Sequence, residues 1–478
     1  MKKIFLLLIL IPLLNFSQNK KIELDYTFGN NGLYTSNLSN YFSKVLPDGK
    51  IIFVTKEFER YININDYVIT RLLANGTVDN TFGNNGHVYT KNLIVNVFDF
   101  EFLFADDGTI FIAAALFGTQ ETASKFVKLN INGVLDTSFG IDGILTIDNI
   151  DVSYGFGNSI ELSNGNILFT LTNSILCISK NGEIINSFGN NGYLDYSGII
   201  KIIKATDAFL LLTEQYNSAT NESTFQIKKH NNNGTINTQF NTIAYTYSQP
   251  RFSTRFVIDK NENIYTLQNF FNVSAPSIIK KYDSDGVQNP NFGNNGILSE
   301  ASRQIKGIFF DLDNNPILFG IYYNLDNLKP TMIRYTKNGI LDTTFNGNGY
   351  YEESNNISLR EYYYADVTSD NKIIVSGSMI YSPYSAYVAR YKMTDLPLST
   401  DIVELNNILS IYPNPVIDNF KIKINQEKIQ LVRIYSIDGK LVYESKTEIN
   451  NIDELSKGIY IVKVKTEKNT YSKKLIKE

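Results

Sequence analysis

A short phrase recurs seven times along this chain, and it restricts the fold more than any other feature. The first copy reads Leu24-Asp25-Tyr26-Thr27-Phe28-Gly29-Asn30-Asn31-Gly32, and every copy centres on one phenylalanine. These phenylalanines are spaced 49 to 57 residues apart, at Phe28, Phe82, Phe139, Phe188, Phe240, Phe292 and Phe345. A period near 50 residues suits one four-stranded propeller blade and is too long for most helical repeats. The spacing therefore predicts seven similar β-units.

Three turn signals divide each unit. Six residues before the phenylalanine stands a Gly, usually after Asn or Asp, as in Asn75-Gly76, and such pairs favour tight hairpins. A Gly-rich turn follows the phenylalanine, as in Gly83-Asn84-Asn85-Gly86, and a further turn such as Asp107-Gly108 comes later in the unit. Between the turns lie β-branched and aromatic runs, such as 51–55 and 110–114, which predict strands.

The residues of the phrase have a structural interpretation. One large apolar side chain at the same place in every unit would form a layer between neighbouring sheets. The Asp or Asn three residues earlier, Asp79 for example, can accept a hydrogen bond from its own backbone in an Asx turn. The alternative, that these carboxylates bind a metal or a substrate, has weaker support.

The two ends of the repeat array complete each other. The first copy, around Phe28, lacks the preceding strand and its Asn-Gly turn, whereas the last unit ends with the matching strand 387–391 but lacks the phrase that should follow. An N-terminal piece that pairs with the last unit would close a ring and remove two exposed sheet edges. The sequence thus predicts an all-β chain with a seven-bladed β-propeller over residues 18–394. An open solenoid with polar caps is the alternative.

A second module is expected at residues 407–478, after a linker over 395–406. Strands are predicted at 420–424, 431–436, 441–443, 458–464 and, as the last one, 471–476, and this spacing suggests a small Ig-like β-sandwich. Three motifs stand in order within it. Their residues are Tyr412, Pro413, Asn414 and Pro415 in the first, Gly439 and Lys440 in the second, and Gly458 and Tyr460 in the third.

Both patterns are similar to known families. The recurring phrase resembles the delta-60 repeat, whose members are β-propellers, although the fifth copy around Phe240 has lost both turn glycines. The three C-terminal motifs resemble the type A sorting domain of the type IX secretion system. That resemblance implies passage across the outer membrane, the secretion machinery as a partner, and either release or attachment to surface lipopolysaccharide. An ordinary fibronectin-like domain would explain the fold but not the C-terminal position behind a signal peptide.

Residues 1–17 fit a Sec signal peptide. Lys2 and Lys3 precede an apolar run from Ile4 to Leu14, and the chain then turns polar. This run is too short for a membrane-spanning helix, which needs about 20 residues. We therefore expect a secreted protein or one attached to the outer surface. A short buried strand is the alternative interpretation of this segment.

Composition excludes several classes of function. The net charge is −4, from 44 basic and 48 acidic residues, so no strong field attracts nucleic acid. With only His87, His230 and Cys177, a metal site built on His or Cys is nearly excluded. We expect no cofactor, no metal and no catalytic residue, both histidines at the surface, and Cys177 buried in a strand. The segment 259–263 starts like an EF-hand loop, but Ile264 replaces its Gly, so it is interpreted as a strand-linking turn.

Three functions stay open, and enzymatic activity is the least favoured of them. The first is an exported binding or adhesion protein that holds an extracellular protein or glycan on loops at one face of the ring. The second is a structural component of the cell surface. The third is a carboxylate-dependent glycan hydrolase or lyase, which convergent Asp, Glu and Arg side chains at the channel mouth would favour.

Overall fold

The computed structural model describes residues 19–58, 65–116, 123–153, 155–247, 252–270, 275–301, 303–324, 327–353, 359–379, 382–395, 409–424, 427–467 and 470–478. The expected signal peptide lies outside these residues, as does the expected linker apart from Asp395. The chain divides into two compact units, residues 1–395 and 396–478.

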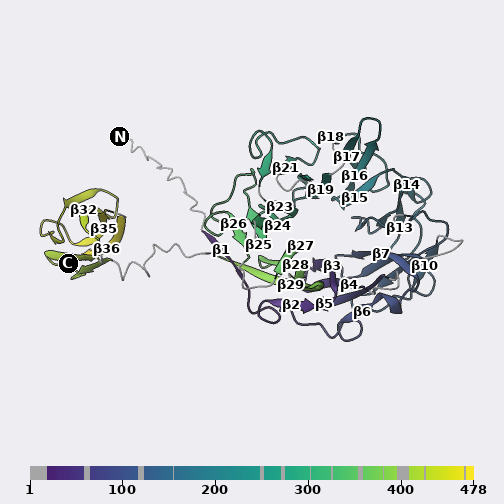
Figure 1. Ribbon diagram of the computed structural model, residues 1–478, viewed down its shortest axis with the longest axis horizontal. Helices are drawn as coiled ribbons and strands as arrows, with labels where there is room; N and C mark the ends of the chain where they lie inside the picture. The colour runs from purple at the N-terminus through teal and green to yellow at the C-terminus, as the bar shows by residue number, and fades with distance from the viewer. Residues whose placement is uncertain are drawn as a thin grey trace, which may run out of the picture. The chain divides into compact units, whose positions relative to one another are not determined.

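Seven antiparallel sheets make up the described part of the first unit, and they are arranged around a central axis as the blades of a β-propeller (Figure 1). Blade 1 contains β3 (Ser39–Val45), β4 (Ile51–Phe58), β5 (Asn65–Leu72) and β6 (His87–Tyr89). Blade 2 contains β7 (Val97–Phe104), β8 (Ile110–Leu116), β9 (Ser124–Leu129) and β10 (Ile144–Ile147). Blade 3 contains β11 (Ser159–Glu161), β12 (Ile167–Thr170), β13 (Ser174–Ile178) and β14 (Tyr193–Asp195). Blade 4 contains β15 (Ile199–Lys204), β16 (Ala208–Asn217), β17 (Glu222–Asn231) and β18 (Ile243–Tyr247). Blade 5 contains β19 (Phe252–Ile258), β20 (Ile264–Phe270), β21 (Ser277–Tyr282) and β22 (Leu298–Glu300). Blade 6 contains β23 (Arg303–Phe310), β24 (Pro316–Asn324), β25 (Asn327–Arg334) and β26 (Tyr350–Glu352). A 3-10 turn, η1 (Thr90–Asn92), follows β6.

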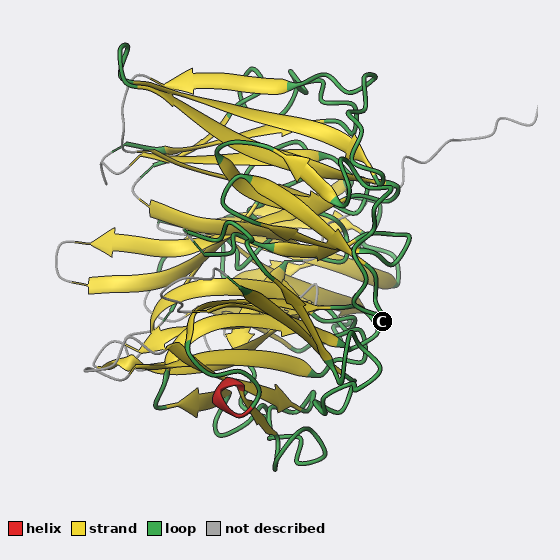
Figure 2. Ribbon diagram, turned by 90° about the vertical axis from the view of Figure 1, so that its right-hand side faces the viewer, coloured by secondary structure: helices red, strands yellow, loops and turns green. Residues whose placement is uncertain are grey.

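Blade 7 is built from both ends of the first unit. Its strands are β27 (Leu359–Val367), β28 (Lys372–Met379) and the long β29 (Ser382–Asp395), and the outer edge of β29 is covered by β1 (Lys20–Leu24) and β2 (Leu33–Ser36). Leu24 of β1 pairs with Tyr391 of β29, and Leu33 of β2 pairs with Ala389 of β29. This pairing confirms the predicted ring closure. Figure 2 shows the ring turned by 90°, with its strands running between two faces rimmed by loops and turns.

Neighbouring blades are joined by the recurring phrase. All seven signature phenylalanines are buried, with exposed fractions of 0 to 8%, and each of the first six lies against the Asn-Gly or Asp-Gly turn of the next blade. A Cβ atom on Gly76, for example, would lie 2.8 Å from the Phe28 ring and 2.6 Å from the Gly29 nitrogen. These turns therefore need glycine for the close approach as well as for its positive φ.

A backbone hydrogen bond accompanies each of these contacts. The residue after the phenylalanine donates its N–H to the carbonyl before the glycine in the next blade. The six bonds are Gly29 to Asn75, Gly83 to Asn132, Gly140 to Asn181, Gly189 to Asn233, Asn241 to Asp285 and Gly293 to Asn338, at 2.7 to 3.0 Å. Between blades 6 and 7 the acceptor is Lys20 in β1, which takes the Asn346 N–H at 2.5 Å. The N-terminal strand thus supplies the seventh joint.

An ion pair reinforces several blades. In blade 1, Arg71 Nε donates to Asp79 Oδ2 at 2.8 Å, both side chains are buried, and another guanidinium nitrogen reaches the Ile131 carbonyl of blade 2. The guanidinium also lies over the Phe82 ring, 4.7 Å from its centroid. In blade 7, Arg390 and Asp25 make the same pair at 2.8 Å across the ring closure.

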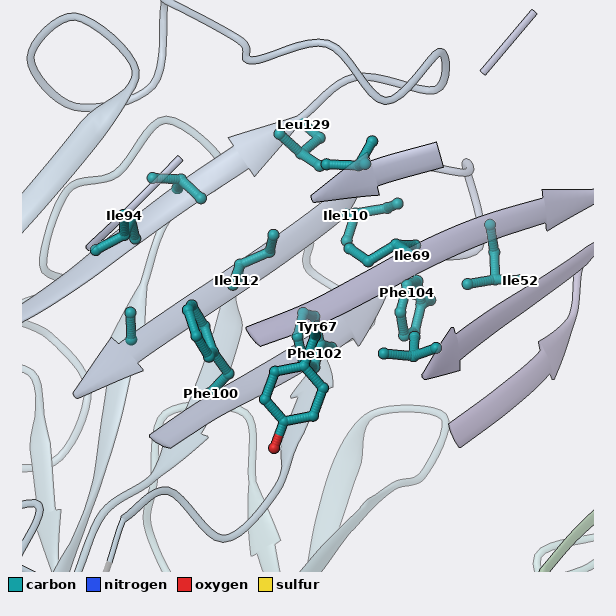
Figure 3. Close-up of a cluster of buried hydrophobic side chains, with 14 of the residues drawn as sticks. Ile52, Tyr67, Ile69, Ile94, Phe100, Phe102, Phe104, Ile110, Ile112 and Leu129 are labelled. Atoms are coloured by element: carbon teal, nitrogen blue, oxygen red, sulfur yellow. The ribbon is translucent and has the colours of Figure 1, made fainter. Parts of the chain in front are cut away.

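Apolar side chains fill the space between blades. Figure 3 shows one such cluster, in which Ile52, Tyr67 and Ile69 of blade 1 meet Phe100, Phe102 and Ile112 of blade 2. The innermost strand of each blade contributes to these layers, so the strands nearest the axis are fixed by packing on both sides. This rigid wall positions the candidate site.

The second unit is a β-sandwich. Its smaller sheet contains β30 (Leu409–Tyr412), β31 (Asn419–Ile424) and β34 (Ile449–Asn451), and its larger sheet contains β33 (Leu441–Ser445), β32 (Ile429–Ser436), β35 (Gly458–Thr466) and β36 (Thr470–Lys477). Phe420 and Ile422 from one sheet share a core with Val432, Ile434 and Val462 from the other. Strands β30 and β34 are additional to the predicted ones.

The expected surface position of His230 is wrong. This side chain has an exposed fraction of 0% in β17, where its ring stacks on Phe209 with centroids 5.2 Å apart. Nδ1 lies 3.0 Å from the Gly234 carbonyl, which can only accept, so Nδ1 carries the proton and Nε2 accepts from the Tyr196 hydroxyl at 3.2 Å. Burial lowers the pKa of His230. The Asn-Gly turn therefore uses this histidine as a buried hydrogen-bond donor.

Candidate functional site

The innermost strands of five blades converge on one pocket. The labels β3, β15, β19, β23 and β27 lie closest to the centre of the ring in Figure 1. Four of these strands carry a β-bulge at the same level, where Tyr41, Ile200, Lys306 and Tyr363 are the extra residues. A bulge bends its strand and re-aims the side chains beside it, and bulges are common next to functional sites.

Two adjoining cavities, of about 190 and 620 Å³, form this channel pocket. The larger volume falls in the range typical of ligand sites. The side chains shared by both cavities are Lys201, Arg255, Lys306, Tyr363 and Tyr364. Asn40, Tyr41 and Thr254 also line the larger cavity, and Tyr265 and Phe319 line the smaller.

Three cations from three neighbouring blades dominate the pocket. Lys201, Arg255 and Lys306 belong to β15, β19 and β23. The Arg255 guanidinium donates to the Lys306 carbonyl, and Lys306 Nζ lies 4.0 Å from Glu361 Oε2. Within the residues that the structure describes, neither Lys201 nor Arg255 forms an ion pair. Burial, and then the Arg255 charge, lower the pKa of Lys201 to about 8.

Aromatic side chains form the adjacent wall. Tyr41 comes from β3, and Tyr363 and Tyr364 come from β27. Tyr364 makes an edge contact with Phe42, with centroids 5.0 Å apart, and the Tyr363 hydroxyl lies 3.3 Å from Ser378 Oγ. These contacts hold the rings in place while part of each remains available to a ligand.

Neutral polar groups complete the lining. Thr254 has an exposed fraction of 6%, and its hydroxyl has no hydrogen-bond partner in the described part of the chain. The same holds, among described residues, for both amide atoms of Asn40 and for the Tyr265 hydroxyl. Buried polar groups are normally hydrogen-bonded, so these unpaired atoms, which are themselves closed to solvent, are an unusual feature of the pocket wall.

Carboxyl groups lie on the blade 2 side of the axis. Glu101 in β7 accepts from Ser159 Oγ at 2.8 Å, and burial raises the pKa of Glu101 to about 8 against this hydrogen bond. After burial, the Glu101 charge contributes to raising the pKa of Tyr41. Burial also raises the pKa of the neighbouring Asp99. The pocket therefore combines a strongly basic side with an acidic group nearby.

The signature phenylalanines do not line this pocket, because they lie between blades. Their preceding acids form Asx turns: Asp79 Oδ1 accepts from Thr81 N–H at 3.1 Å, and Asp25 Oδ1 from Thr27 N–H at 3.1 Å. The segment 259–263 is the predicted strand-linking turn, in which Asp259 Oδ1 accepts from Asn261 and Asn263 at 2.9 Å.

The lone cysteine and the remaining histidine also lie apart from the pocket. Cys177 is fully buried as predicted, and burial raises the pKa of its thiol to about 12. His87 is partly buried rather than at the surface, with Nδ1 3.0 Å from Thr70 Oγ1, and burial lowers its pKa.

The motif residues of the second unit hold its edge strands. The Asn414 side chain, between Pro413 and Pro415, donates to the Lys474 carbonyl and accepts from the Ile476 N–H, each at 2.8 Å. Tyr460 is buried and donates to the Ser456 carbonyl at 2.7 Å, whereas Tyr412 is exposed. Gly439 occupies the positive-φ position of the turn before Lys440, and Gly458 begins β35.

Sequence reasoning missed every residue of the channel pocket. Position is the signal that could have found most of them: the pocket residues on the innermost strands lie a few residues before the first hairpin turn of their unit, whereas Tyr265 and Phe319 follow it in β20 and β24. Among the described residues, no three His, Cys, Asp or Glu side chains are grouped to hold a metal ion. No helix in the described ranges is long and apolar enough to cross a membrane.

Comparisons with known proteins match both units. A family model for the secretion system C-terminal sorting domain covers residues 410–478, and one for a β-propeller domain of unknown function, DUF5122, covers residues 46–82. The ulvan lyase NLR42 of Nonlabens ulvanivorans is 33% identical over 94 residues, which are 18% of this chain and 17% of that lyase. The match thus spans less than a fifth of either protein.

Solved structures with a similar course of the chain are distant in sequence. A protein of unknown function from Dyadobacter fermentans is 11% identical, with a TM-score of 0.42 over 78% of this chain and 99% of its own. The β-propeller domain of the Trilobed protease from Pyrococcus furiosus is 9% identical, with a TM-score of 0.41 over 77% and 100%. Residues 46–82 of the seven-bladed unit thus match the delta-60-repeat-like β-propeller family DUF5122, and residues 410–478 match a C-terminal sorting domain of the type IX secretion system.

Proposed function

We propose that this chain is an exported binding protein whose propeller holds an extracellular partner in the channel pocket. The sorting domain indicates secretion or an outer-surface location. The observation that carries the binding function is the convergence of basic, aromatic and unpaired polar side chains from five blades on one pocket. Burying charged and polar side chains together lowers the stability of the fold, and a core built only for packing would not contain them.

A pocket-filling variant tests this function without changing charge. Ile200 lines the pocket at a bulge, so Ile200→Trp would occupy part of the 620 Å³ cavity. Ile141, which is 82% exposed beside an outer groove between blades 2 and 3, gives the matched control Ile141→Trp. The full chain would be incubated with extracellular polymer from cultures of the producing bacterium, and retention measured by pull-down.

The proposal expects retention of the unaltered chain and of I141W, and loss of retention for I200W with an unchanged melting temperature. Equal retention of all three proteins would overturn it. If I200W melts early, Tyr363→Ala, which empties rather than fills the pocket, provides the second variant and should also weaken retention.

Export is tested separately. Residues 405–478 fused to a periplasmic reporter, in a bacterium that has a type IX secretion system, should carry the reporter to the medium or the cell surface. The exchange Val462→Pro would disrupt β35 in its interior, where it pairs with both β32 and β36, and should leave the reporter in the periplasm. Retention of the unaltered fusion in the periplasm would contradict the export role.

Structural self-association and glycan cleavage remain weaker alternatives. Convergent carboxylates at the channel mouth would have favoured cleavage, but the groups that converge on the pocket are chiefly cations and tyrosines.

A further inference from the structure

The ligand class can be argued from the charge of the channel pocket. Lys201, Arg255 and Lys306 come from consecutive blades and face one cavity, with Glu361 as the single carboxylate within ion-pair distance among the described residues. Like charges held together in a partly buried site repel one another, and each has lost hydration. An oxyanion between them would relieve both costs, and Arg favours planar, bidentate recognition of such groups.

The body of the ligand can be argued from the other walls. Tyr41 of blade 1 and Tyr363 and Tyr364 of blade 7 line the same cavity. Tyrosine combines an apolar face with a polar tip and suits ligands of mixed character. Asn40 and Thr254 also line this cavity, but their polar atoms, which lack partners among the described residues, are closed to solvent, so the cations and the tyrosines supply the ligand contacts.

We infer that the channel pocket binds an acidic saccharide. Its carboxylate or sulfate group lies among Lys201, Arg255 and Lys306, and its sugar ring rests against the tyrosines. The inference rests on the proposed binding function and names its ligand class. Carboxylate and sulfate share the chemistry that the cations recognise, so the experiment separates these two sources.

The test is a titration calorimetry series on the purified full chain with defined oligosaccharides. The probes are a polygalacturonate hexamer for carboxylate, a carrageenan-derived hexamer for sulfate, a maltohexaose as the neutral analogue, and sodium sulfate as the anion without a sugar. At least one acidic hexamer should bind at least tenfold more tightly than maltohexaose and sodium sulfate.

Charge variants identify the site. In Lys201→Gln/Arg255→Gln/Lys306→Gln, affinity for the acidic hexamer should fall at least tenfold. The matched control Lys421→Gln/Lys423→Gln/Lys463→Gln removes the same charge from exposed positions of the second unit and should leave affinity within twofold. If the pocket triple variant melts early, the single exchange Lys306→Gln should still weaken binding at least threefold.

Two results would overturn the inference. The inference fails if maltohexaose binds as tightly as the acidic hexamers, or if the pocket triple variant keeps wild-type affinity. If I200W then still abolishes retention on extracellular polymer, the binding function stands and only its ligand class falls. If no hexamer binds and I200W retains the polymer, both proposals fall together.

Discussion

At the residue scale, the blades show how one position can use two kinds of side-chain pair. Arg71 and Asp79 form a buried ion pair in blade 1, whereas blade 3 has Cys177 and Ile185 at the same places. The backbone bond is the same in both, with Asp79 N–H donating to the Arg71 carbonyl and Ile185 N–H to the Cys177 carbonyl. The fold therefore requires the backbone bond and tolerates exchange of the charges as a pair.

Breaking one half of the pair should cost more than removing both charges. Arg71→Met leaves the buried Asp79 carboxylate without its cation, which typically costs about 3 to 5 kcal/mol. Arg71→Met/Asp79→Asn keeps the Asx turn, as Asn237 does in blade 4 by accepting from Gln239 N–H at 3.0 Å, and should recover at least half of the loss. Urea titrations of the three proteins measure this, and a double variant as unstable as the single one would contradict the argument.

Acid should weaken the same pair. The pKa of Asp79 is lowered: burial alone would raise it, but the Thr81 hydrogen bonds and the Arg71 charge outweigh burial. A depressed carboxyl pKa contributes stability above its unfolded value and loses that contribution as pH falls through the folded value.

A second residue-scale prediction separates close packing from positive φ. Gly76 has φ +84° and abuts Phe28 and Gly29, whereas Gly49 has φ +81° with only the Ala74 Cβ nearby, at 3.5 Å from an added Cβ. Gly49→Ala should cost about 1 to 2 kcal/mol for the left-handed backbone alone. Gly76→Ala should cost roughly 1 to 3 kcal/mol more, because it also overpacks the joint between blades. If chemical denaturation gave equal losses in the free energy of unfolding for both variants, the joint between blades would accommodate the added methyl group without cost.

At the scale of elements, ring closure depends on β1. This strand pairs with β29 from Lys20 opposite Asp395 to Leu24 opposite Tyr391, and its Lys20 accepts the seventh interblade hydrogen bond. Without it, the part of the β29 edge from Tyr391 to Asp395 and the joint to blade 6 would both be exposed, although β2 would still pair with residues 386–389. The closure thus relies on β1 for the joint to blade 6 and on both strands for the edge of β29.

A disulfide across this closure should form and stabilise the ring. Glu23 and Lys392 are directly opposite each other, and such pairs have Cα atoms about 4.5 to 5.5 Å apart, within the range for a disulfide. Glu23→Cys/Lys392→Cys should therefore oxidise spontaneously and melt at a higher temperature when oxidised than when reduced. The loop entropy removed from the unfolded chain can raise the free energy of unfolding by up to about 5 kcal/mol. The native Cys177 thiol is buried and does not interfere. Two free thiols persisting at these positions under oxidising conditions would count against the closure.

The elements also show where the sequence is informative. Turns were predictable because Asn-Gly and Asp-Gly pairs favour positive φ. Second strands were predictable because β8 is wholly apolar and β4 begins with four apolar residues. The innermost strands escaped prediction because bulges break their alternation, as at Tyr41 and Lys306, and because charged residues interrupt them. His230 was misplaced because its polar neighbours in sequence conceal a burial that only the Phe209 and Tyr196 contacts create.

At the scale of the whole molecule, the ring brings together residues that are far apart in sequence. Tyr41 and Tyr364 line one pocket although they belong to the first and last blades. The closure was readable from the complementary chain ends, but the pocket was not, because its members share no local motif and meet only through the geometry of the ring. The sorting domain was readable as a motif, since its residues are local in sequence.

The charge of the pocket predicts how its affinity for an acidic oligosaccharide changes with pH. Burial and the Arg255 charge place the pKa of Lys201 at about 8, and burial places the pKa of Glu101 at about 8. As pH rises from 7 to 9, Lys201 loses its positive charge and Glu101 gains a negative one. Arg255 and Lys306 are two further cations of the pocket, so binding should weaken about tenfold rather than vanish, which corresponds to about 1.4 kcal/mol.

Three variants assign this pH dependence. Lys201→Arg, which stays protonated, should hold affinity nearly constant between pH 7 and 9 apart from the Glu101 contribution, and Lys201→Gln should give weak binding at both values. Glu101→Gln should reduce the slope but not remove it. The measurement is the dissociation constant at pH values of about 6.5, 7.5, 8.5 and 9.5, at constant ionic strength. A wild-type affinity that rises with pH would mean that Lys201 does not face the anion, because deprotonating a lysine beside a bound carboxylate or sulfate can only weaken its attraction.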